Sequence, residues 1–74
     1  MCYAKLRGKI KEVYGIQARF AEAMGMDRST LSLKLNGKSE WSRIEVENAC
    51  KLLKIPMQDV YEYFFYHESL EITT

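Results

Sequence analysis

Glycine and proline divide this sequence into short segments in which apolar residues recur at helical spacing. Gly15, Gly25 and Gly37 each follow such a segment, and Pro56 precedes the last one. Glycine is favoured just after a helix, and proline is favoured at its first position. The spacing predicts five helices, over about 3–14, 17–24, 28–36, 42–53 and from 56 onward. We expect an all-α fold that ends in a short extended C-terminal tail.

Two polar residues mark helix starts. Asp27 precedes the third segment, where its side chain would accept hydrogen bonds from the first free amides of a helix. Ser42 is followed three residues later by Glu45, which is the pattern of a capping box. Both residues therefore predict N-caps, the first for helix three and the second for helix four.

The chain has 74 residues, which allows one domain. No apolar run approaches the roughly 20 residues of a membrane span, and the N-terminus lacks the apolar core of a signal peptide. Cys2 and Cys50 are too few for a disulfide scaffold, so we expect two reduced thiols. These features favour a cytoplasmic protein with no membrane association.

Residues that carry catalysis or bind metals are scarce. His67 is the only histidine, and no Cys or His pair has metal-ligand spacing. Neither GxGxxG nor a phosphate-binding loop is present, and a chain this short encloses little pocket. We expect no enzymatic activity, no metal or other cofactor, and no small-molecule ligand.

Charge is distributed unevenly, although the net charge is only +1. Residues 1–38 carry eight basic and three acidic side chains, for a net charge of +5. Residues 39–74 carry three basic and seven acidic side chains, for a net charge of −4. The basic half favours a polyanionic partner such as nucleic acid.

The second and third helices are the informative pair, because a tight turn at Gly25 joins them. Ala21 is small enough for close helix contact, and Met26 is placed to fill the corner. This is the layout of a helix-turn-helix, whose second helix enters the DNA major groove. Operator DNA is therefore a candidate partner.

Helix three has a predicted outward face opposite Leu31 and Leu35. An outward Leu33 is suited to contact a thymine methyl, and Arg28 is suited to bind guanine. The predicted base-reading residues are Arg28, Ser29, Ser32 and Leu33. The predicted phosphate contacts are Gln17, Thr30, Lys34, Asn36, Lys38, Ser39 and Arg43. The alternative is a solvated helix face on which Leu33 is exposed by chance.

Residues 17–37, QARFAEAMGMDRSTLSLKLNG, resemble the lambda-repressor/Cro-like (XRE-type) helix-turn-helix family. Gln17, Ala21, Gly25 and the Asn36–Gly37 pair match positions typical of that family. The resemblance covers about residues 3–66. It is greatest for the small repressor-like proteins of Gram-positive phages and prophages, through the segments 5–10, 30–38 and 63–65. It implies a DNA-binding domain over 1–66, with 28–36 as the recognition helix, that represses transcription from an operator.

Such proteins bind paired half-sites as dimers. The C-terminal segment has more apolar residues than a five-helix core needs, so it predicts a homodimer through helix five and residues 67–74. The expected interface residues are Tyr61, Phe65, Tyr66 and Leu70. The alternative for this segment is an extended core with a frayed tail. The alternative for the whole chain is a protein-interaction module on the same scaffold that does not bind an operator.

Overall fold

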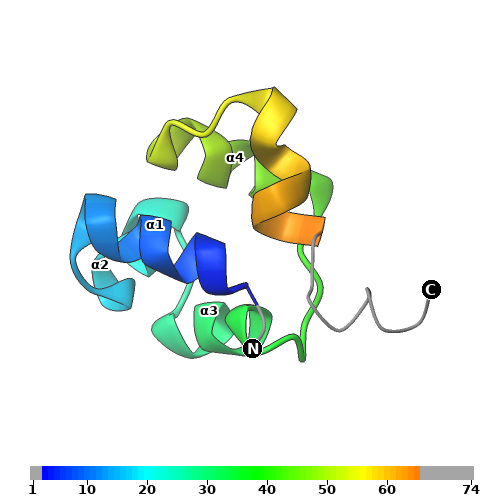
Figure 1. Ribbon diagram of the computed structural model, residues 1–74. Coiled ribbons are helices and arrows are strands. Elements are labelled where there is room, and N and C mark those ends of the chain that lie inside the picture. Colours follow the sequence, from blue (N-terminus) through cyan, green and yellow to red (C-terminus); the bar gives the residue numbers. More distant parts are fainter. Residues whose placement is uncertain (1–2, 66–74) are drawn as a thin grey trace.

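The computed structural model describes residues 3–65, which form helices and turns with no strand among them (Figure 1). The helices are α1 (Ala4–Tyr14), α2 (Gln17–Met24), α3 (Arg28–Leu35) and α4 (Arg43–Leu53), followed by the 3-10 turn η1 (Met57–Asp59) and the π-helical turn η2 (Tyr61–Phe65). The predicted all-α fold of five helical segments is confirmed. Its fifth segment consists of η1 and η2 instead of a continuous α-helix. The predicted tail, 67–74, lies outside the described residues.

The reversal between α2 and α3 depends on Gly25. Its φ of 77° lies in the left-handed region, which glycine enters without a Cβ clash. The amide of Met26 donates to the carbonyl of Ala21 at 3.0 Å, and the amide of Gly25 donates to that of Glu22 at the same distance. These two bonds form a Schellman motif, which satisfies the last carbonyls of α2 and turns the chain toward α3.

The two predicted N-caps have different outcomes. At α4, the Ser42 hydroxyl accepts from the Glu45 amide and the Glu45 carboxylate accepts from the Ser42 amide, so the capping box is confirmed. At α3, Asp27 occupies the N-cap position with an extended backbone, but its side chain makes no capping hydrogen bond. The side-chain cap predicted for Asp27 is therefore wrong.

The core is built from the apolar faces of all four α-helices and closed by the C-terminal turns. The buried residues are Leu6, Ile10, Phe20, Ala21, Leu31, Leu35, Val46, Ala49, Cys50, Leu53, Ile55 and Phe64. Trp41, in the loop between α3 and α4, packs edge-on against Phe64 with ring centroids 5.1 Å apart. The Cys50 thiol is free, and its burial raises its pKa above the ordinary value.

The last turns return to the first helix. Lys5 of α1 donates to Oε1 of Glu62 at 2.6 Å, and its ammonium lies 5.0 Å from the ring centre of Tyr63. These contacts fix η2 beside α1. Within the described part of the chain, no helix is both long and apolar enough to span a bilayer.

Candidate functional site

α3 presents one side to the core and the other to solvent. Leu31 and Leu35 are fully buried, whereas Leu33 is 49% exposed. Arg28, Ser29 and Ser32 are exposed as well. The four residues predicted to read bases are thus all exposed along α3. We call these four residues, together with Lys38 just after the helix, the α3 face.

Lys38 is held next to Leu33 by the backbone. Gly37 has a φ of 75°, and its amide donates to the carbonyl of Lys34 at 3.2 Å. The amide of Lys38 donates to the carbonyl of Leu33 at 2.9 Å. This is a second Schellman motif, and it places the backbone of the exposed Lys38 next to that of the exposed Leu33.

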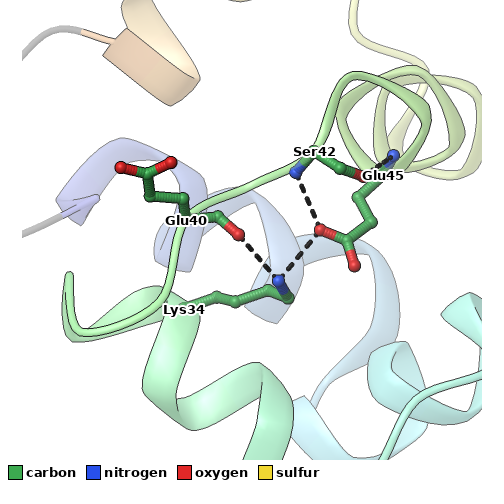
Figure 2. A network of polar contacts seen from close by, with 4 residues as sticks. All are labelled: Lys34, Glu40, Ser42 and Glu45. Atoms are coloured by element: carbon green, nitrogen blue, oxygen red, sulfur yellow. Dashed lines mark hydrogen bonds and ion pairs between the residues drawn. The ribbon is translucent and has the colours of Figure 1, made fainter.

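Lys34 does not belong to this face, because its side chain points inward. Figure 2 shows its ammonium between the loop that leads to α4 and the first turn of that helix. Nζ donates to the carbonyl of Glu40 at 2.8 Å and lies 2.9 Å from Oε1 of Glu45. The Lys34 side chain is only 8% exposed. The prediction that Lys34 contacts phosphate is therefore wrong, because its charge is neutralised inside the protein.

The same network determines the ionisation of Glu45. Burial alone would raise the pKa of this carboxyl group, but the hydrogen bond from the Ser42 amide and the ammonium of Lys34 outweigh that effect. The pKa of Glu45 is therefore lowered from its ordinary value. Glu45 is therefore a carboxylate at neutral pH, and it forms an ion pair with Lys34.

Asn36 and Arg43, two more of the predicted phosphate contacts, interact with other side chains of the protein. Arg7 of α1 donates from Nη2 to the carbonyl of Leu35 and to Oδ1 of Asn36, both at 2.8 Å. Arg43 pairs with Glu47 at 3.2 Å, although its side chain remains 90% exposed. Of the other predicted contacts, Gln17, Thr30 and Ser39 are half-buried and Lys38 is exposed. The role of Arg7 was not found from the sequence, because 28 residues separate it from Leu35.

Exposed apolar side chains also occur outside α3. Met57, Tyr61 and Phe65 follow one another at intervals of four residues and are 51–68% exposed. Met57 lines an open groove of about 440 Å³ with Glu47, Cys50, Lys51, Ile55 and Pro56. Of the predicted dimer residues, Tyr61 and Phe65 are thus at the surface, whereas Tyr66 and Leu70 lie outside the described residues. The homodimer stays a prediction.

The described residues offer no grouping suited to a metal ion. Among residues 3–65, no three His, Cys, Asp or Glu side chains are placed to bind one together. The candidate site is a surface of exposed apolar and cationic side chains.

A solved structure closely resembles this chain. It is the solution structure of the modulator of repression (MOR) of the temperate bacteriophage TP901-1 from Lactococcus lactis. The two chains are 46% identical, the match covers 85% of each, and the TM-score is 0.77. No match is found among curated proteins.

These similarities correct the sequence-based identification. The neighbour is a modulator of repression, so an operator-binding repressor of the lambda-repressor/Cro-like family is the wrong interpretation. The predictions that the partner is double-stranded operator DNA and that a helix-turn-helix binds it are wrong as well. The buried Lys34 and the Arg7–Asn36 contact are consistent with this correction, because they remove two of the expected phosphate ligands. The model of the family described as "Protein of unknown function (DUF739)" matches residues 1–67, and the chain belongs to that family.

Proposed function

We propose that this chain is a protein-interaction module that binds a repressor protein and changes how that repressor acts. The observation that carries the proposal is the 46% identity, over 85% of both chains, to the phage TP901-1 modulator of repression. At this identity and coverage, the two proteins share a fold over most of their length. The alternative considered from the sequence, a binding module on a repressor-like scaffold, thus becomes the main hypothesis.

The surface chemistry supports a protein partner. Phosphate backbones are bound by many cations at once, and each contributes to affinity. Here Lys34 and Arg43 are paired with carboxylates of the same chain. By contrast, seven large apolar side chains within residues 3–65 are exposed, among them Leu33. Exposed apolar groups of this kind are typical of the centres of protein interfaces.

The proposed role is binding and involves no chemical reaction. A module that acts on a repressor works where the repressor meets DNA. We therefore place its action in the cytoplasm.

The test combines this chain with the repressor of bacteriophage TP901-1 and with the repressor from the genome that encodes this chain. Sedimentation velocity measures complex formation, and fluorescence anisotropy of labelled operator DNA measures operator binding. We expect a complex with a repressor and a shift of about tenfold or more in that repressor's affinity for its operator, the size typical of coupled binding. We expect the chain alone to leave the anisotropy unchanged.

The control is a salt series with a random-sequence duplex. Attraction to phosphate would strengthen steeply as salt is lowered, whereas the proposed module shows no such binding. If neither repressor forms a complex, the proposal is wrong.

A further inference from the structure

The α3 face, composed of Arg28, Ser29, Ser32, Leu33 and Lys38, combines an apolar centre with cations at both ends. Leu33 is 49% exposed, although Leu31 and Leu35 on the same helix are fully buried. We propose that the α3 face is the docking surface for the repressor, and that it receives an apolar side chain flanked by carboxylates. This assignment rests on the proposed function and adds the surface and the chemistry of the partner.

The charge of the α3 face is unbalanced within the chain. The helix Arg28–Leu35 contains no acidic residue. Arg28 and Lys38 are exposed, and neither forms an ion pair with a carboxylate of residues 3–65. Along the chain, Asp27 is the carboxylate nearest to Arg28, and Glu40 is the one nearest to Lys38. The uncompensated cations are complementary to a surface that bears Asp or Glu side chains.

A backbone hydrogen bond fixes where the main chain of Lys38 lies. The bond from its amide to the Leu33 carbonyl closes the Schellman motif at the end of α3. The motif fixes the backbone of Lys38 next to that of Leu33 before any partner arrives. Such preorganisation lowers the conformational entropy lost on binding.

The exposed apolar area around Met57 has different charge chemistry. The groove beside Met57 is lined by Glu47 and Lys51, which carry opposite charges. It therefore has no preference for an acidic or a basic partner. The surface around α3 also differs from the predicted phosphate-binding surface, because two of the expected phosphate ligands, Lys34 and Asn36, are engaged by groups of the same chain. What remains exposed is a leucine on a helix with an exposed cation at each end, which fits a protein contact of mixed apolar and ionic character.

The experiment measures the dissociation constant for the two repressors named above by isothermal titration calorimetry. The variants on the α3 face are Leu33→Ser, Arg28→Glu and Lys38→Glu. The matched controls are Ile44→Ser, at a leucine-sized exposed residue on α4, and Lys51→Glu, at an exposed cation of the groove. Circular dichroism and thermal unfolding verify that each variant is folded. All substituted side chains are exposed, so the fold does not depend on them.

We expect each α3-face variant to weaken binding by about tenfold or more, and each control by less than about threefold. The two charge reversals should have their largest effect at low salt, because the contacts are ionic. If the unsubstituted chain binds neither repressor, the proposed function is wrong and this assignment is wrong with it. If it binds and only the control variants lose affinity, this assignment alone is wrong. Binding of random duplex DNA that is lost in Arg28→Glu would assign the α3 face to nucleic acid and overturn the proposal.

Discussion

The ammonium of Lys34 lies 2.9 Å from Oε1 of Glu45, and this ion pair joins α3 to the first turn of α4. Removing the carboxylate would leave the buried ammonium without its counter-ion. Glu45→Gln keeps an oxygen that can accept from the Ser42 amide, so it removes mainly the ion pair. We expect it to lower the free energy of unfolding by about 1–3 kcal/mol. Urea denaturation followed by the fluorescence of Trp41, the single tryptophan, measures this loss.

The control for this variant is Glu47→Gln. Glu47 pairs with Arg43 on the same helix, where the two side chains are 43% and 90% exposed. Exposed pairs at this spacing contribute about 0.3–0.5 kcal/mol. Equal losses in the two variants would contradict a special role for the buried pair.

The pH dependence of the free energy of unfolding should report the contribution of the Lys34–Glu45 ion pair. The pKa of Glu45 is lowered in the folded state, so its contribution is complete above its ordinary value of 4.5. That contribution is lost as the pH falls through the folded-state pKa. Unfolding free energies measured from about pH 7 down to about pH 3 should differ most between the native chain and Glu45→Gln at neutral pH. The two curves should converge at acid pH, where Glu45 is protonated. A constant difference at all pH values would contradict this prediction.

Helix positions were predictable because local signals determine them. Gly25, Gly37 and the Ser42–Glu45 capping box lie at the ends of elements that the structure confirms. The core face of α3 followed from the spacing of Leu31 and Leu35. These features need only neighbours three to six residues apart, which the sequence shows directly.

Features that depend on distant residues were not predictable in this way. A lysine on a short polar helix is usually exposed, but Lys34 is buried by the loop that carries Glu40 and Trp41. Asn36 matches a family motif, but its partner is Arg7 on another helix. The helical spacing therefore predicted the all-α fold correctly, whereas the family motif predicted the partner wrongly.

Gly8 and Gly25 form a matched pair for testing backbone conformation. At both positions an added Cβ would have no heavy atom within 4 Å. Gly8 lies inside α1, where alanine is favoured over glycine, so Gly8→Ala should raise the free energy of unfolding by about 0.5–1 kcal/mol. Gly25 has a φ of 77°, where the left-handed conformation costs alanine about 1–2 kcal/mol and the lower backbone entropy of alanine offsets about 0.5–1 kcal/mol, so Gly25→Ala should lower it by about 0.5–1 kcal/mol. Urea midpoints measure both changes, and shifts of the same sign would contradict the prediction.

Lys54 ends α4 in a conformation that favours glycine. Its φ is 58°, and its amide donates to the carbonyl of Lys51 at 3.4 Å. The left-handed conformation costs about 1–2 kcal/mol for a residue with a Cβ, and glycine loses about 0.5–1 kcal/mol more backbone entropy on folding. Lys54→Gly should therefore raise the free energy of unfolding by about 0.5–1 kcal/mol. Lys51→Gly, inside the same helix, is the matched control and should lower it by about 1 kcal/mol. Thermal and urea unfolding measure both variants, and a loss of stability in Lys54→Gly would show that Lys54 is not strained.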